Sequence, residues 1–207
     1  MNMKIIIPGD KIADGAVRME NAFVEDSKTY ATVLGLLDEQ SKAFIPLESV
    51  WYPREGDSLI GVVENVRNSV AMVNTNSTFR GLIIGRRGDS ESEMNIGEVV
   101  SAFVREVKRE ADQIILILER PRKLFGGKLI FVKPSKISRV IGRQSTMLRQ
   151  LETGTHCTIS VGLNGVVWMK GGDVQLAIRA IDKIREEAHT SGLTERIAKM
   201  LASEAIK

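Results

Sequence analysis

The 207-residue chain has little of the chemistry that metal sites and nucleophilic enzymes need. It contains one cysteine, Cys157, and two histidines, His156 and His189. One thiol cannot form an internal disulfide, and these three side chains cannot supply four ligands to a structural zinc ion. His156 also adjoins Cys157 in a strand-like run, where neighbouring side chains point to opposite faces. We expect Cys157 to be a small buried apolar residue and neither residue to be catalytic.

Long apolar runs and enzyme motifs are also missing. No run approaches the roughly 18 to 20 apolar residues of a membrane span, and residues 1–10 are interrupted by Lys4, Pro8 and Gly9. The sequence has no phosphate-binding glycine loop and no HExxH motif, and Asp10 and Asp14 suit turns better than a metal site. We therefore expect a non-catalytic cytoplasmic protein without a metal or other cofactor and without a membrane partner.

Positive charge is concentrated in the last part of the chain. The net charge of +3 divides into −3 for residues 1–55, −2 for residues 56–120 and +8 for residues 121–207. Between Glu119 and Glu152 there is no acidic residue. The bases of this acid-free window are Arg120, Arg122, Lys123, Lys128, Lys133, Lys136, Arg139, Arg143 and Arg149. A solvated basic face is the usual explanation for a charge run, but nine bases without one acid favour a surface that faces a polyanion.

The first two segments of the chain are predicted to be β-rich. Residues 1–55 give short strands at Lys4–Ile7, Ala31–Leu34 and Lys42–Leu47, separated by turn residues that include Gly35 and Asp38. This small domain is a candidate for docking on a neighbour, because a unit of this size buries little core. Residues 56–120 give five strands, which indicate a closed OB-type barrel. Those strands are Ser58–Arg67, Val70–Asn74, Arg80–Ile84, Glu98–Lys108 and Gln113–Glu119.

The third segment, residues 121–207, alternates strands and helices. A strand at Lys128–Val132 ends at Pro134, and two short helices follow, the second of which is expected to stop at Gly154. Two further strands, Cys157–Val161 and Val166–Met169, join through Asn164-Gly165, a strong hairpin signal. Asp173 is a good N-cap for the next helix, and an amphipathic helix covers Thr194–Ala205. The fold class is thus multi-domain: a mainly β N-terminal half and then an α+β unit of order β-α-α-β-β-α.

This order resembles the KH family, in which an Ile-Gly-x-x-Gly loop joins the two short helices. Here the loop is Ile141-Gly142-Arg143-Gln144-Ser145, and Ser145 occupies the second glycine position. We expect the serine to cap the following helix, whose N-terminal N–H groups favour phosphate. Because the loop lies outside the core, Gly142→Asp should weaken RNA binding without unfolding. The RNA-binding residues expected here are Lys133, Lys136, Arg139, Gly142, Arg143, Gln144 and Ser145.

Residues 56–120 resemble the RNA-binding barrel of ribosomal protein S-one, through Gly61-Val62-Val63, Gly81-Leu82-Ile83 and Ile96-Gly97-Glu98-Val99-Val100. Aromatic faces commonly stack bases on such barrels. Phe103 sits in the middle of a strand and is expected to be buried, whereas Phe79, beside a turn, is the better stacking candidate. The barrel residues expected to contact RNA are Arg67, Phe79, Arg80, Arg86, Arg87, Arg105 and Lys108.

The three segments in this order resemble the RNA-binding cap subunit of the archaeal exosome. The resemblance extends to Ile6-Ile7-Pro8-Gly9-Asp10 and to Trp51-Tyr52-Pro53-Arg54-Glu55-Gly56-Asp57. It implies domains at 1–55, 56–120 and 121–207, and three cap copies on a phosphorolytic ring of other subunits. It also implies that the chain binds single-stranded RNA and directs its 3′ end into that exoribonuclease ring for degradation or processing. Two alternatives stay open: an RNA-binding transcription elongation factor of the antitermination type, and a structural scaffold with little RNA binding.

Overall fold

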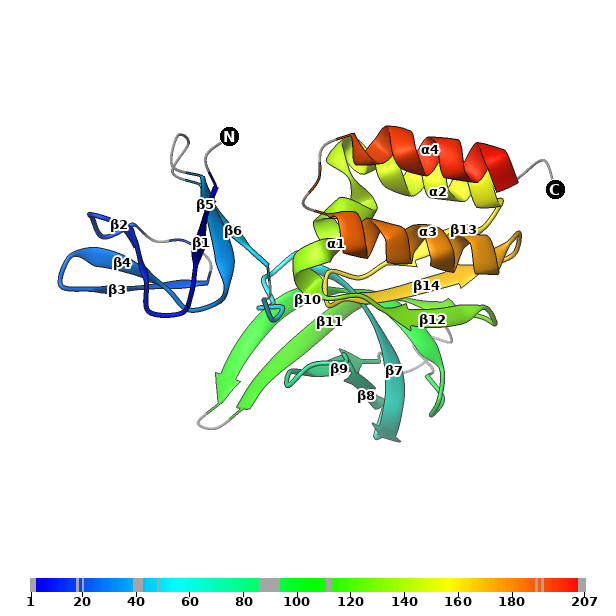
Figure 1. The fold of residues 1–207 in the computed structure, drawn as a ribbon. Helices are drawn as coiled ribbons and strands as arrows, with labels where there is room; N and C mark the ends of the chain where they lie inside the picture. The colour runs from blue at the N-terminus through cyan, green and yellow to red at the C-terminus, as the bar shows by residue number, and fades with distance from the viewer. Residues whose placement is uncertain are drawn as a thin grey trace. The chain divides into compact units, whose positions relative to one another are not determined.

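The structure is a computed structural model that describes residues 3–17, 19, 21–38, 43–47, 49–85, 94–110, 113–188, 190 and 192–204. It divides into two compact units. One unit comprises residues 1–50 with residues 133–135, and the other comprises residues 51–132 and 136–207. The second unit therefore contains both the barrel and most of the α+β part (Figure 1).

The N-terminal unit consists of two three-stranded antiparallel sheets. In the first, β5 (Gly35–Asp38) lies between β1 (Met3–Ile6) and β6 (Phe44–Pro46). In the second, β4 (Lys28–Ala31) lies between β2 (Lys11–Ala13) and β3 (Ala22–Glu25). A small core holds the unit together and is formed by Ile6, Ile12, Ala31 and Leu37.

The predicted strand Ala31–Leu34 is wrong. Ala31 ends β4, and the next strand begins at Gly35, which the sequence had suggested was a turn residue. Gly35 belongs in a strand because the Phe44 ring packs against it where a side chain would otherwise stand. The predicted strands at Lys4–Ile7 and Lys42–Leu47 correspond to β1 and β6, although Lys42 lies outside the described residues.

The barrel is closed and contains five strands. They are β7 (Ser58–Arg67), β8 (Val70–Asn74), β9 (Arg80–Ile84), β10 (Val99–Glu110) and β11 (Gln113–Leu124). Their order around the barrel is β10-β11-β9-β8-β7, and β7 pairs with β10 to close it. All neighbours are antiparallel except β9 and β11. Inward-facing residues, which alternate with outward-facing ones along the strands, form one core, with Leu59, Val100 and Leu116 completely buried.

The α+β part is a three-stranded antiparallel sheet with helices on one face (Figure 1). Its strands are β12 (Lys128–Phe131), β13 (Thr158–Val161) and β14 (Val166–Lys170), and β14 lies in the middle. Its helices are α1 (Pro134–Ile141), α2 (Thr146–Thr155), α3 (Val174–Glu187) and α4 (Leu193–Glu204). The strand and helix order confirms the predicted fold class.

Helix boundaries follow the local chemistry, with one exception. Pro134 opens α1, where its missing N–H costs nothing. The Asp173 carboxylate caps α3 by accepting from Leu176 N at 2.8 Å, as predicted. Gly154 does not end α2, because the left-handed residue is His156, two positions later. Gly154 instead lies inside the helix, against Leu201 of α4, where a Cβ would come within 2.8 Å of that side chain.

The core of the α+β part lies between its sheet and its helices. It includes Cys157, which is 4% exposed, and this confirms that the lone thiol is a buried apolar residue. Ile181, Ile184 and Ile197 contribute completely buried side chains from α3 and α4. In the connection between α1 and α2, none of the residues Arg143–Ser145 is buried.

Candidate nucleic-acid interface

The loop Gly142–Ser145 joins α1 to α2 in a conformation that requires a glycine at its first position. Gly142 has φ 74° and ψ 170°, a region that L side chains avoid. A Cβ there would lie 2.7 Å from both the N and the Cβ of Met147, and Met147 is buried. The reason given for a harmless Gly142→Asp, that the loop lies outside the core, therefore does not hold at this position, and the effect on folding stays a prediction. Gly142 is a structural residue of the loop as well as a candidate for close approach to phosphate.

Ser145 does not cap α2 as predicted. It has φ 60° and ψ 22°, and its side chain accepts no capping hydrogen bond. A capping side chain needs an extended backbone at the N-cap, and the left-handed conformation turns the hydroxyl away from the first-turn N–H groups. The first turn of α2 also has no acidic residue. Thr146 N already donates to Arg143 O and Ser145 N to Gly142 O, so it is chiefly the positive end of the helix dipole that favours an anion here.

Basic side chains approach this loop along α1. Lys136 and Arg139 are three residues apart and share a face of the helix, while Ile137 and Val140 are buried on the other face. Arg139, Arg143 and Gln144 are exposed, whereas Lys136 and Ser145 are half-buried. Of the seven predicted residues at this loop, the structure brings six together: Lys136, Arg139, Gly142, Arg143, Gln144 and Ser145. Lys133 is exposed but falls in the segment grouped with the N-terminal unit.

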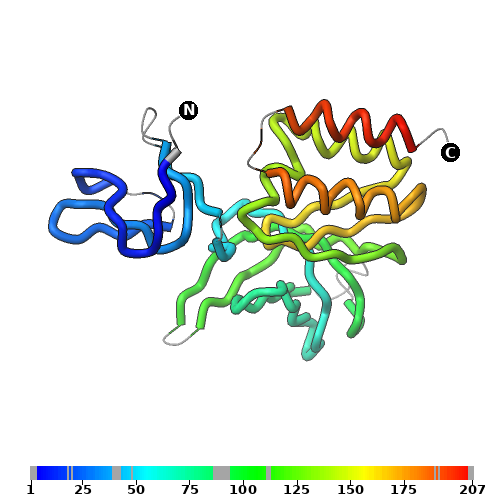
Figure 2. Tube along the Cα trace, in the orientation of Figure 1, coloured from blue at the N-terminus to red at the C-terminus, as the bar shows by residue number. Residues whose placement is uncertain are grey.

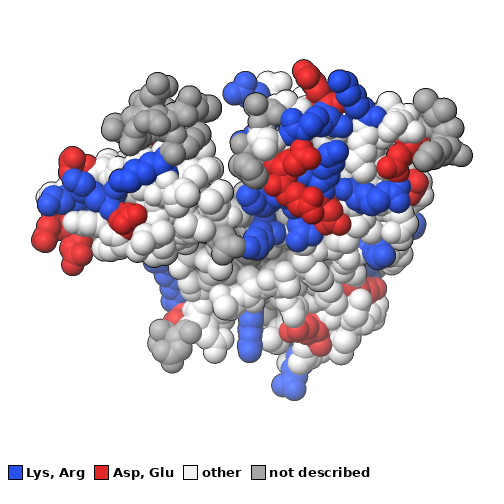
Figure 3. Space-filling view, in the orientation of Figure 1, with Lys and Arg blue, Asp and Glu red and all other residues white. Residues whose placement is uncertain are grey.

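The face drawn in Figure 3 shows how these charges are distributed. Lysine and arginine side chains gather over the helices of the α+β part, with acidic side chains among them. The barrel surface on the same face is mostly uncharged, with scattered bases and acids. The window without acidic residues in the sequence therefore does not form a surface without acidic residues. Helix α3 brings acidic residues such as Asp182 and Glu186 into the same part of the molecule.

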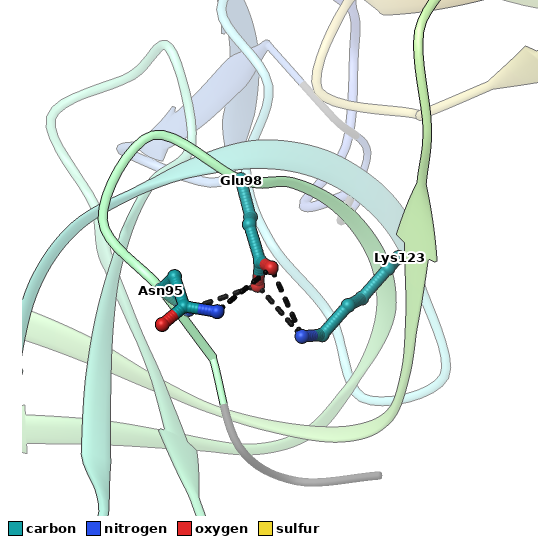
Figure 4. Close-up of polar contacts among 3 residues, drawn as sticks. All are labelled: Asn95, Glu98 and Lys123. Atoms are coloured by element: carbon teal, nitrogen blue, oxygen red, sulfur yellow. Dashed lines mark hydrogen bonds and ion pairs between the residues drawn. The ribbon is translucent and has the colours of Figure 1, made fainter.

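One base of the acid-free window is neutralised by the barrel (Figure 4). Lys123 Nζ lies 3.0 Å from both carboxylate oxygens of Glu98. Asn95 donates to the same carboxylate through its backbone N at 2.9 Å and its side chain at 3.1 Å. Burial raises the pKa of Glu98, but the hydrogen bonds from Asn95 and the charge of Lys123 outweigh it and hold the pKa below the ordinary value of 4.5. The charge of Lys123 is thus paired with Glu98 within the barrel.

On the barrel, strand register brings two of the predicted bases into one lateral row. Lys108 pairs with Ile115, Ile115 pairs with Arg80, and Arg80 pairs with Asn74. Lys108, Arg80 and Asn74 are exposed, so their side chains point outward from one row, in which Ile115 separates Lys108 from Arg80. We call Lys108, Arg80 and Asn74 the barrel row. It places Arg80 and Lys108 on one outer face, although 28 positions separate them in the sequence.

The other predicted barrel bases are dispersed. Arg67 is exposed at the end of β7, where it pairs with Val70 beside the tight turn into β8. Arg105 is exposed at an irregularity in the β10–β11 pairing. Arg86 and Arg87 lie outside the described residues. Of the five predicted barrel residues that the structure describes, only Arg80 and Lys108 therefore share a row.

The two barrel phenylalanines have the opposite placement from the one predicted. Phe103 points outward from β10 and is 43% exposed. Phe79 is half-buried and packs edge-on against Trp51, with ring centroids 6.1 Å apart. Trp51 is itself fixed by donating from Nε1 to Asp57 at 3.0 Å. The position of Phe79 beside a turn suggested an exposed ring. Its ring is half-buried because the segment before the barrel folds back and brings the Trp51 ring against it.

Tyr52 is an aromatic residue that the sequence did not single out as a contact. Its side chain is 66% exposed, and its ring lies 6.0 Å from that of Phe79. The segment carrying Trp51 and Tyr52 had been interpreted only as a domain seam. The signal available in the sequence was two adjacent aromatics in a chain that is only 5% aromatic.

Other classes of site find little support in the described part of the chain. Among those residues no group of three or more His, Cys, Asp and Glu side chains could hold a metal ion. None of the described helices is long and apolar enough to cross a membrane. The features that remain are the phosphate-compatible loop, its basic approach and the outward residues of the barrel.

Two sequence-family models match the chain. The KH domain model matches residues 127–175, which include the loop Gly142–Ser145. The model described as the N-terminal domain of the exosome RNA-binding protein RRP4 matches residues 3–48. Both matches fall on segments for which the sequence had indicated the same families.

Relatives match the chain over nearly its whole length. The exosome complex component Rrp4 of Methanothermus fervidus is 34% identical over 210 residues, covering 95% of this chain and 94% of that protein. Rrp4 of Methanosarcina mazei is 34% identical and covers 100% of this chain and 85% of that protein. A solved structure assigned as an exosome complex RNA-binding protein is 29% identical, with a TM-score of 0.64 over 76% of this chain and 98% of that one. The chain belongs to the Rrp4 family of archaeal exosome complex components, as its resemblance had implied.

Proposed function

We propose that this chain is a non-catalytic RNA-binding cap subunit of the archaeal exosome. It binds single-stranded RNA and directs the 3′ end into a phosphorolytic exoribonuclease ring, on which three copies sit. The observation that carries the proposal is the loop Gly142–Ser145, whose glycine turn opens an uncapped α2 beside Arg139 and Arg143. A sugar-phosphate backbone fits such a loop, because it meets N–H donors, a helix dipole and two exposed guanidinium groups together.

The barrel supports the same proposal as a second, weaker contact surface. Arg80 and Lys108 of the barrel row can meet successive phosphates, and Phe103 offers an exposed ring. We therefore assign phosphate clamping to the α+β part, called the KH part from here on because the KH domain model matches it, and supplementary contacts to the barrel.

Docking is proposed for the exposed face of the β1-β5-β6 sheet. Ile5 pairs with Leu36, and Leu36 pairs with Ile45, so the three side chains form one cross-strand row. Ile5 is 66% exposed and Ile45 is 40% exposed, whereas Ile6 and Leu37 on the opposite face are buried. An apolar row exposed on a small sheet is typical of a protein interface. Other subunits of the exosome are the partners that the family implies for this face.

RNA binding is tested by titrating fluorescent single-stranded RNA at about 50 and 200 mM salt. We expect affinity to fall steeply with salt, and Arg143→Ala to weaken binding several-fold. Arg185→Ala is the matched control, because Arg185 is an exposed arginine on α3 that pairs with Asp182 at 2.7 Å. Salt-independent binding, or equal losses in both variants, would contradict the assignment of the loop. Absence of binding by the intact chain would favour the scaffold alternative.

Docking is tested separately by co-purification with phosphorolytic ring subunits. We expect Ile5→Glu to abolish recovery of the ring, because a charge in the apolar row would be buried at the interface. RNA affinity of the isolated variant should be unchanged. Lys28→Glu, which changes charge on the other sheet of the same unit, is the control and should retain the ring. Recovery of a transcription complex in place of the ring would favour the antitermination alternative.

A further inference from the structure

Along one edge, the first half of β7 is covered by none of the barrel strands that the structure describes. Residues 58–62 pair with β10 on one side. On the other side β8 pairs with β7 only from Val62 onward. The backbone groups of Ser58 and Ile60 on this second side therefore need partners from elsewhere, because Ile60 is only 1% exposed.

The turn between β13 and β14 of the KH part supplies those partners. Leu163 N donates to Ser58 O at 2.8 Å. The Asn164 side chain accepts from Ile60 N at 3.2 Å and donates to Ile60 O at 2.7 Å. The same amide donates to Thr75 O, in the β8–β9 connection, at 2.8 Å. Asn164 thus pairs with Ile60 as a neighbouring strand would, and it also holds a second barrel segment.

Only a carboxamide can make this set of bonds from one side chain. It donates twice and accepts once, whereas an ionised carboxylate only accepts and an aliphatic side chain does neither. Asn164 is 2% exposed, so water cannot replace the missing partners after substitution. The Asn-Gly pair, predicted from sequence as a hairpin turn, is thus also the connection between two folded parts.

An apolar layer surrounds the connection. Ile60 and Leu124 from the barrel pack with Val166 and Trp168 from the KH sheet. Trp168 Nε1 also donates to Gly126 O at 2.7 Å in the segment that joins the two parts. The hairpin of β13 and β14 (yellow to orange in Figure 2) contacts β7 of the barrel (teal). The barrel and the KH part nevertheless have separate cores, so each can remain folded when the connection is weakened.

We infer that Asn164 is a positioning residue that holds the KH loop and the barrel row as one rigid RNA-binding platform. The inference rests on the proposed RNA-binding function. Two weak sites in fixed register bind one strand more tightly than either site alone, because the second contact becomes intramolecular. A strand too short to reach both sites gains nothing from the connection. Asn164 therefore controls how affinity grows with RNA length and leaves the intrinsic affinity of each site unchanged.

The test measures dissociation constants of unstructured RNAs of about 4, 8, 16 and 24 nucleotides, since a KH loop holds about four nucleotides and an OB barrel about 4 to 16. Asn164→Ala should weaken binding of the longest RNA by about tenfold or more and leave that of the shortest unchanged. Gln175→Ala, which removes an exposed amide on α3, is the matched control and should retain the wild-type dependence on length.

Two structural readouts accompany the titrations. The Ile60 amide should exchange faster with solvent in Asn164→Ala, and residual dipolar couplings should fit one alignment tensor in the wild type and two in the variant. Asn164→Ser, a milder change, replaces Asn164→Ala if the latter does not fold. Equal loss at every length, or no loss at any length, would overturn the inference. Wild-type protein that binds no RNA would instead overturn the proposed function, while the alignment data would still report whether Asn164 fixes the two parts.

Discussion

The KH loop and the barrel row position their candidate RNA contacts in different ways. The loop is four consecutive residues, and its geometry follows from local backbone conformation at Gly142 and Ser145. The barrel row is assembled through strand register, and Lys108 of β10 and Arg80 of β9 share a row only because both pair with Ile115 of β11 between them. A contiguous loop can therefore be read from a motif, whereas a row across strands depends on tertiary pairing.

The largest expected effect comes from a substitution that disrupts the KH loop and leaves the barrel intact. Gly142→Ala should destabilise the KH part by about 2 to 3 kcal/mol, because it adds both backbone strain and a clash with Met147. Thermal unfolding followed by circular dichroism measures the loss. Gly97→Ala is the control, because Gly97 also has a positive φ of 87° but no atom within 4 Å of the added Cβ. Equal losses in the two variants would mean that the clash contributes nothing.

The next prediction separates structural from exposed aromatics on the barrel. Phe79→Ala should lower the free energy of unfolding by about 2 kcal/mol, because Phe79 packs against Trp51 and the barrel core. Phe103→Ala should leave stability unchanged and weaken RNA binding by about 1 kcal/mol or more. Denaturant unfolding and RNA titration on both variants provide the measurements. A destabilised Phe103 variant with normal RNA affinity would restore the placement expected from the sequence.

A smaller effect is expected from a substitution that relieves backbone strain in the KH loop, and it tests the loop without touching the barrel row. Ser145→Gly should stabilise the protein by about 0.5 to 1 kcal/mol, since a left-handed conformation costs a serine about 1 to 2 kcal/mol and glycine loses more chain entropy on folding. RNA affinity should also rise, because the backbone can approach phosphate more closely. Ser69→Gly relieves similar strain at φ 64° in the β7–β8 turn, away from the loop, and is the control. Stabilisation by both variants with an affinity gain only at Ser145 is the expected pattern.

The smallest expected effect concerns the ion pair inside the barrel. Glu98→Gln should cost no more than about 1 kcal/mol near neutral pH. Because the folded pKa of Glu98 lies below the ordinary value of 4.5, its contribution is present above that pH and is lost as pH falls through the folded pKa. Wild type and variant should thus converge in stability in acid. Unfolding curves from pH 7 down to about pH 3 measure this, and a difference that does not shrink over that range would contradict it.

The strand assignments illustrate where sequence patterns suffice. The predicted bounds of β7, β8 and β9 agree with the structure, because alternating apolar residues between clear turns define each strand locally. The N-terminal strands agree less well, since Gly35 and Asp38 carry turn signals but lie in β5 through packing against distant residues. Local signals fail where a tertiary contact decides the conformation.

The sequence by itself determined the order of domains, the fold class and the position of the KH loop, because each depends on periodicity or on consecutive residues. Only the tertiary structure decided which aromatic is exposed, which base Glu98 neutralises and which bases share a face. It also decided that Asn164, in an ordinary turn motif, completes a barrel strand 104 positions away. Such contacts join residues whose spacing in the chain carries no signal, and burial and hydrogen-bond satisfaction alone bring them together.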